Sequence, residues 1–141
     1  MSKKNFLDKS TEAYKIQLGE SIKKCRGKLS LRSVTDSTIL SASNLQYIER
    51  GINAPTAEAY EMIIKKLNPD QKTRADMDKC YMAIRKAPPP DVCKTVMNTD
   101  GLIDALRNFN GQALTDTQAQ KLQLLLASFS GENQKGENNH D

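Results

Sequence analysis

The side chains best placed to do chemistry lie on a short predicted helix over residues 42–50, and they are hydrogen-bonding groups. Hydroxyl and amide groups both donate and accept hydrogen bonds, so they suit recognition better than bond cleavage. The outward positions of this helix are Ala42, Ser43, Asn44, Gln46 and Tyr47. Leu45 and Ile48 fall on the opposite side of the same helix and predict its buried face.

Residue types that carry catalysis or bind metals are sparse. The chain has three cysteines, Cys25, Cys80 and Cys93, and a single histidine, His140. No two cysteines have metal-ligand spacing, and His140 lies in a polar tail where no fold would position it. No serine or cysteine has a base at usable spacing, and the glycines form no phosphate-binding loop. We therefore expect no enzyme activity, no cofactor and no metal.

Positive charge is concentrated in one segment. Residues 15–68 contain nine Lys and Arg against five Asp and Glu, a net charge of +4 that equals the net charge of the whole chain. The sequence pI is about 9.0. Such a segment suits a polyanionic partner, although basic proteins without one are common.

Helical periodicity positions these groups. An apolar stripe of Tyr14, Leu18, Ile22 and Cys25 predicts a first helix from about Ser10 to Gly27. Serine or threonine caps followed by apolar spacing predict further helices over 31–37, 42–50 and 57–67. Val34, Leu40, Leu45 and Ile48 are expected to lock the second and third of these helices together.

The second half of the chain divides differently. A helix is expected from Pro69 to Lys86, followed by a stiff linker over residues 87–90 that is the best candidate domain boundary. Helices are then expected over 92–108, interrupted near 98–101, and over 115–129. The last of these carries a dense apolar stripe, which needs a cover from the preceding helix or from another subunit. The stripe contains Leu122, Leu125, Leu126 and Phe129.

The chain lacks a stretch apolar enough to predict a membrane span, and its basic N-terminus lacks the apolar core of a signal peptide. We therefore expect a cytoplasmic protein without a membrane partner.

A spaced pattern over about fifty residues resembles the Xre/Cro-type helix-turn-helix regulators, the family of the lambdoid phage repressors. The most specific part is Ile48-Glu49-Arg50-Gly51 followed by Pro55-Thr56. The rest of the pattern comprises Leu18-Gly19, Ile22, Arg26, Ser30, Val34, Leu40-Ser41, Leu45, Tyr60, Ile63 and Leu67. The resemblance implies an all-α fold, in which a lambda-repressor-like five-helix domain precedes a small helical C-terminal element.

The same resemblance implies roles for single residues. The helix over 42–50 would enter the major groove of duplex DNA, where Ala42, Ser43, Asn44, Gln46 and Tyr47 would read base edges. Phosphate contacts would come from Lys23, Lys24, Arg32, Arg50 and Asn53. Glu49 would brace the packing of the helices, because a carboxylate facing phosphate would be repelled.

Two positions depart from the family pattern. Leu31 stands where a glutamine commonly contacts phosphate, and Ile39 stands where the turn commonly has glycine. A β-branched residue is strained in the left-handed conformation that such a turn requires, so we expect either a locally rebuilt turn or a slightly different meeting of the two helices.

A second, shorter similarity covers Phe109-Asn110-Gly111 and Leu114-Thr115-Asp116 before the Leu-rich helix. It resembles the C-terminal segment of repressors from phages and integrative elements of Gram-positive bacteria. This similarity implies an oligomerisation or regulatory role for Leu122, Leu125, Leu126 and Phe129.

The sequence thus predicts a transcription regulator, a repressor that binds an operator as a dimer, from a phage or another mobile element. The alternative is a protein-interaction module of the same fold, such as an antirepressor or an antitoxin, with a regulatory protein as its partner. The expected segments are a flexible N-terminus at 1–9, the DNA-binding domain at 10–68, a helix and Pro-rich linker at 69–91, the C-terminal element at 92–129 and a disordered tail at 130–141.

Overall fold

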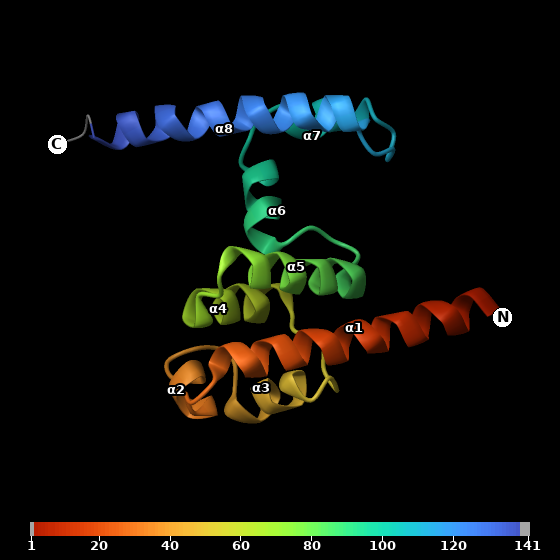
Figure 1. The fold of residues 1–141 in the computed structure, drawn as a ribbon, viewed down its shortest axis with the longest axis vertical. Helices are drawn as coiled ribbons and strands as arrows, with labels where there is room; N and C mark the ends of the chain where they lie inside the picture. Colours follow the sequence, from red (N-terminus) through yellow and green to blue (C-terminus); the bar gives the residue numbers. More distant parts are fainter. Residues whose placement is uncertain (1, 139–141) are drawn as a thin grey trace. The chain divides into compact units, whose positions relative to one another are not determined.

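The computed structural model describes the backbone of residues 2–138 and the side chains of residues 11–130. Within this range every regular element is an α-helix, which confirms the all-α fold class (Figure 1). The helices are α1 (Ser2–Arg26), α2 (Leu31–Thr35), α3 (Ala42–Glu49), α4 (Ala57–Leu67), α5 (Gln71–Arg85), α6 (Pro90–Met97), α7 (Leu102–Arg107) and α8 (Asp116–Asn138). None of the described helices is long and apolar enough to cross a bilayer.

Side-chain caps explain where the internal helices begin. The hydroxyl oxygens of Ser30, Ser41 and Thr56 accept hydrogen bonds from backbone N–H groups in the first turns of α2, α3 and α4, at 3.0–3.1 Å. The carboxylate of Asp70 does the same for α5 at 2.7 Å. Each bond satisfies one of the amide donors that a helix start leaves without a partner.

The chain ends differ from expectation. The first helix begins at Ser2, well before the predicted start near Ser10, so residues 2–9 are helical where a flexible segment was expected. The last helix continues to Asn138, into the predicted tail. Residues 139–141, including His140, lie outside the described residues.

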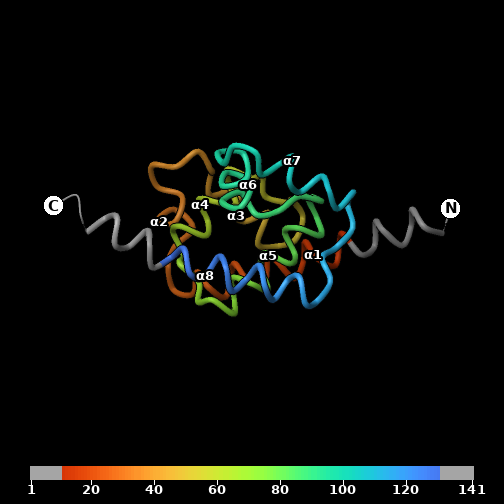
Figure 2. The backbone as a smooth tube through the Cα atoms, turned by 90° about the horizontal axis from the view of Figure 1, so that it is seen from above, coloured from red at the N-terminus to blue at the C-terminus, as the bar shows by residue number. Residues whose placement is uncertain are grey.

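Residues 1–98 form one compact unit with a single core. The long α1 lies beside α5, as the ribbon and the backbone tube show (Figures 1 and 2), and it also packs on α3. The core residues are Leu18, Ile22, Val34, Leu40, Leu45, Ile48, Ala59, Tyr60, Ile63, Ile64, Met77, Cys80 and Tyr81. The rings of Tyr60 and Tyr81 stack with their centroids 4.4 Å apart, and the Tyr60 hydroxyl donates to Asp78.

The Pro-rich stretch is not the boundary between units, which corrects the expected linker. Its last residue, Pro90, begins α6, and α6 packs on α4. Lys94 on α6 pairs with Glu61 on α4 at 2.6 Å, and Arg74 on α5 pairs with Asp91 at 3.0 Å. Proline suits the first turn of a helix because its missing N–H has no intrahelical role there. The boundary instead follows Asn98, within the predicted interruption.

The turn between α2 and α3 is built without a left-handed residue at position 39. Ser37 has the positive φ of 59°, and this ends α2 at Thr35 rather than at the expected Ser37. The Thr38 hydroxyl donates to the Thr35 carbonyl at 2.7 Å and accepts from the Leu40 N–H at 3.2 Å. Ile39 is therefore spared the strained conformation, and its side chain is 73% exposed.

Candidate nucleic-acid interface

One side of α3 is buried and the other is exposed and polar. Val34, Leu40, Leu45 and Ile48, the four residues expected to lock α2 onto α3, are at most 4% exposed. Ser43, Gln46 and Tyr47 lie on the exposed side, whereas Ala42 and Asn44 are half-buried. The exposed side of α3 therefore presents the hydroxyls of Ser43 and Tyr47 and the amide of Gln46 to solvent, from a helix that is fixed by its apolar side.

The loop after α3 folds back on that helix. The carbonyl oxygen of Tyr47 accepts hydrogen bonds from the backbone N–H groups of Ile52 and Asn53, at 2.9 and 3.3 Å. The side chain of Asn53 donates to the side-chain oxygen of Asn44 at 3.0 Å. Asn53, expected to contact phosphate, thus bonds to a residue expected to read bases.

Arg85, the last residue of α5, holds the same loop from the other side. Its Nε donates to the Pro55 carbonyl at 2.9 Å and its Nη2 to the Ala54 carbonyl at 3.0 Å. This contact could not be predicted from the sequence, because nothing in the local sequence links Arg85 to a loop some thirty positions earlier. Arg85 joins the loop to the helix that packs along α1.

Close packing fixes α3 against α1. A Cβ atom added at Gly19 would lie 2.4 Å from the Ile48 carbonyl oxygen, and one added at Gly51 would lie 2.8 Å from the Ile16 Cα. Gly51 also has a φ of +76°, a conformation that favours glycine. Both glycines belong to the motif pattern, and here each permits a close approach of α1 and the α3 segment.

Arg26 and Glu49 form a two-bonded ion pair between α1 and α3. Their nitrogen–oxygen distances are 2.6 and 2.8 Å, and the Glu49 side chain is only 4% exposed. The hydrogen bond to Glu49 raises the pKa of the Arg26 guanidinium above its ordinary value, although burial opposes this shift. Arg26 also donates to the Leu29 carbonyl. The two charges therefore pair with each other within the protein. Glu49 thereby braces α3 against α1, the role expected for it.

The expected phosphate-contacting cations do not all come together. Lys23 and Arg50 line one groove between α1 and α3, together with Gln46, Leu31 and the acidic Glu20. Lys24 lies apart from them, in a groove formed with α5 and lined by Ser21, Cys25, Thr73 and Asp76. Arg32 is exposed on α2 and lines neither groove. Adjacent residues on a helix point about 100° apart, which explains why Lys23 and Lys24 separate.

Leu31 is half-buried and packs against the core. Position 31 therefore supplies an apolar contact at the start of α2.

Net charge differs sharply between the two compact units. Residues 1–98 contain 18 Lys and Arg against 11 Asp and Glu, a net charge of +7. Residues 99–141 contain 3 against 6, a net charge of −3. The excess positive charge therefore belongs to the unit that contains α3.

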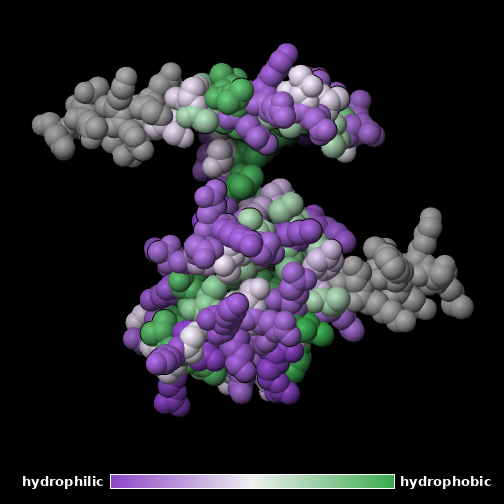
Figure 3. Space-filling model, in the orientation of Figure 1, coloured by the Kyte–Doolittle hydropathy of each residue, from purple (hydrophilic) through white to green (hydrophobic). Residues whose placement is uncertain are grey.

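The second unit has no core among its described side chains. From residue 99 to residue 130 no side chain is buried. The predicted stripe is open: Leu122, Leu125, Leu126 and Phe129 are 40–54% exposed. Figure 3 shows apolar surface on this unit. Within this unit, the expected cover by the preceding helix is thus absent over the described residues.

Among the described residues, no three His, Cys, Asp or Glu side chains gather as metal ligands would. In comparisons with known proteins, no protein-family model, no curated protein and no solved structure matched the chain.

Proposed function

We propose that residues 1–98 bind duplex DNA through α3 and that the protein regulates transcription, acting as a repressor on an operator. The observation that carries the proposal is the exposed polar side of α3 beside Lys23 and Arg50, on the unit with a net charge of +7. A helix of this size fits the major groove, and its first turn can reach base edges.

The flanking cations would supply affinity without sequence preference. Lys23 and Arg50 would neutralise phosphates and release counterions, so binding would weaken steeply as salt concentration rises. Gln46, Ser43 and Tyr47 would supply preference among sequences. Glu20 also lines this groove, and its carboxylate would repel phosphate, so the DNA strand would lie nearer to Arg50 than to Glu20.

We further propose that the protein binds as a dimer and that the second unit joins the two copies. A unit that buries no side chain between residues 99 and 130 needs a partner for its apolar stripe. Lys121 is the only charged residue from 117 to 130, so two copies of α8 can meet without strong repulsion. Two-fold pairing would place two copies of α3 about one DNA turn apart.

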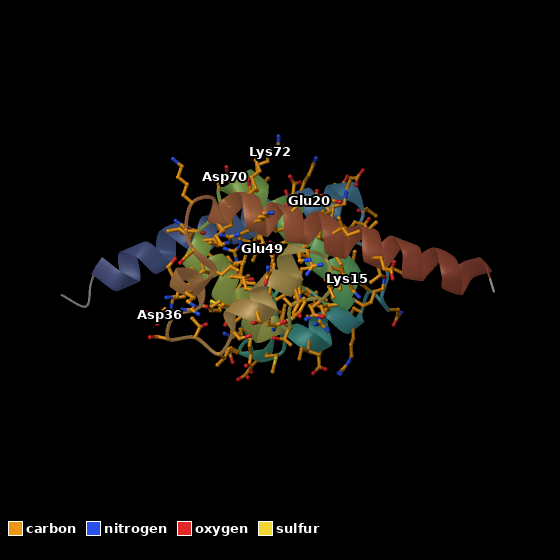
Figure 4. All side chains as sticks on the ribbon, turned by 90° about the horizontal axis from the view of Figure 1, so that it is seen from below. Lys15, Glu20, Asp36, Glu49, Asp70 and Lys72 are labelled. Carbon is orange, nitrogen blue, oxygen red and sulfur yellow. The ribbon has the colours of Figure 1, made fainter. Side chains whose placement is uncertain are left out.

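The direct test is selection of bound sequences from random duplex DNA at moderate salt. Enrichment of an inverted repeat is the expected result, and retention without any enriched sequence would contradict specific recognition. Arg50→Ala should weaken binding to all sequences, whereas Tyr47→Ala or Ser43→Ala should change the preferred sequence. Lys72→Ala is a matched control, because Lys72 lies on the opposite side of α1 from α3 (Figure 4).

Exposed apolar side chains beside α3 support a second candidate function, a protein-interaction module. Ile39 precedes α3 and is 73% exposed, and Ile52 follows it and is 51% exposed. An antirepressor or antitoxin would use such a surface to bind a protein. Failure to retain any DNA, at low as well as moderate salt, would favour this function. An apolar interface should also keep its affinity as salt rises.

A further inference from the structure

The hydrogen bond between Asn44 and Asn53 leaves one donor and one acceptor of the amide pair unused. Asn44 is the third residue of α3 and is half-buried, and Asn53 is exposed in the following loop. The Nδ2 of Asn53 donates to the Oδ1 of Asn44 at 3.0 Å. This bond uses the acceptor of one amide and one donor of the other.

The backbone N–H groups of Asn44 and Asn53 both make hydrogen bonds within the protein, which limits the motion of the two residues. The Asn44 N–H donates to the capping oxygen of Ser41 at 3.1 Å, and the Asn53 N–H donates to the Tyr47 carbonyl at 3.3 Å. Arg85 fixes the next two residues of the loop through their carbonyl oxygens. The amide pair is thus built into the loop before any ligand arrives, which lowers the entropic cost of binding.

The unused groups are a donor and an acceptor. Among the described residues, the bond between them is the one side-chain hydrogen bond that either amide makes, so the Nδ2 of Asn44 and the Oδ1 of Asn53 remain for a ligand. In the major groove only adenine offers an acceptor beside a donor, N7 and the N6 amino group. Guanine offers two acceptors, cytosine a donor and thymine an acceptor with a methyl group. A phosphate offers acceptors alone, so it would leave the Asn53 oxygen without a partner.

We propose that the Asn44–Asn53 pair reads one adenine in each half-site, with the Nδ2 of Asn44 donating to N7 and the Oδ1 of Asn53 accepting from the N6 amino group. This inference rests on the proposed function, because it requires α3 to lie in the major groove. It changes the expected role of Asn53 from contacting phosphate to reading a base together with Asn44.

The test uses the full-length protein and the duplex that selection enriches. Each adenine of a half-site is replaced in turn by 7-deazaadenine, which lacks the N7 acceptor, or by purine, which lacks the N6 amino group. At one position, each analogue should weaken wild-type binding about tenfold. Asn44→Ala should remove the sensitivity to 7-deazaadenine at that position, and Asn53→Ala the sensitivity to purine.

Asn44→Asp separates base reading from a merely structural role. The aspartate keeps an acceptor for the Asn53 amide, but it offers the base an acceptor in place of the donor. The preference for adenine should therefore be lost, with cytosine, which offers a donor, favoured in its place. Asn108→Ala, an exposed asparagine on the other unit, is the matched control and should leave the preferred sequence unchanged. Thermal unfolding of each variant shows that it is folded.

The outcomes distinguish this inference from the proposed function. If wild-type protein enriches no sequence, the proposed function fails. If it enriches an operator but Asn44→Ala and Asn44→Asp weaken binding to every sequence equally, the pair does not read a base and the inference is overturned. Insensitivity of every half-site adenine to both analogues would also overturn it.

Discussion

At the scale of single residues, the ion pair of Arg26 and Glu49 decides how firmly α3 is held. The two side chains are 16% and 4% exposed, and two hydrogen bonds join them. A charge that is removed from water needs its partner, because burial of a lone charge is costly. Glu49 belongs to the same helix as the exposed Gln46 and Tyr47, so loss of the pair should affect both stability and DNA binding.

Glu49→Gln should lower the free energy of unfolding by about 3 kcal/mol, because it leaves the Arg26 guanidinium without a counter-charge. Urea unfolding followed by circular dichroism measures the change. Glu20→Gln, an exposed acid on α1, is the control and should change stability by less than about 0.5 kcal/mol. Equal stability of the two variants would show that the pair contributes little.

At the scale of elements, the packing of α1 on α3 depends on the absence of a side chain at position 19. The backbone oxygens of Ile48 and Glu49 would lie 2.4 and 2.5 Å from an added Cβ. Backbone cannot move aside as the end of a flexible side chain can, so the two helices would have to separate.

Gly19→Ala should therefore destabilise residues 1–98 by about 1–3 kcal/mol, the usual cost of an overpacked core, despite the better helix propensity of alanine. The midpoint of thermal unfolding should fall, and binding to the selected operator should weaken as α3 shifts. Gln17→Ala, at an exposed position on the same helix, should not lower the midpoint. An unchanged or raised midpoint for Gly19→Ala would contradict the close approach.

The start of α5 should give stability a dependence on pH. Thr73 donates hydrogen bonds to Asp70 from its backbone N–H and from its side chain, and both lower the pKa of the Asp70 carboxyl in the folded protein. The bond from the backbone N–H has the larger effect. Because the folded pKa lies below the unfolded value of about 3.9, the carboxylate stabilises the fold at higher pH. This contribution is lost as the pH falls through the folded pKa.

Asp70→Asn keeps a capping oxygen but does not titrate. The difference in unfolding midpoint between wild type and this variant should be largest near neutral pH and should shrink as the pH falls below about 4. Thermal unfolding between pH 7 and pH 2.5 measures this difference. Asp100→Asn, at an exposed position in the second unit, serves as the control. A difference that stays constant with pH would contradict the role of the Asp70 charge.

At the scale of the whole molecule, charge and apolar surface are divided between the two units. The unit proposed to bind DNA has a net charge of +7, whereas the other has −3 and an open apolar stripe. This division suits a protein that binds a polyanion with one part and a second copy with the other.

Leu125→Glu should convert the proposed dimer to a monomer, because the charge would be buried in the seam between two copies of α8. Sedimentation equilibrium measures the mass. Ala127→Glu is the matched control: residue 127 lies with Gln120, Gln123 and Leu124 on the other side of α8. Wild-type protein that sediments as a monomer would contradict this part of the proposal. A variant that remains dimeric would show that the seam lies elsewhere.

Much of the first unit could be predicted from its sequence. The caps Ser30, Ser41 and Thr56 and the apolar spacing of Leu45 and Ile48 act within a few residues along the chain. The limits of α2 were harder to predict, because Ser37 rather than Ile39 adopts the positive φ. The expected boundary at the Pro-rich stretch was wrong because α6 finds partners on α4 and α5.

The sequence by itself determined the all-α class, the buried side of α3 and the concentration of positive charge, because periodicity, capping and charge are local properties. Only the tertiary structure placed Lys23 with Arg50 and away from Lys24, joined Asn44 to Asn53 and brought Arg85 to the Ala54–Pro55 carbonyls. These arrangements connect residues from 9 to 31 positions apart. Their geometry depends on how helices pack, which no local pattern specifies.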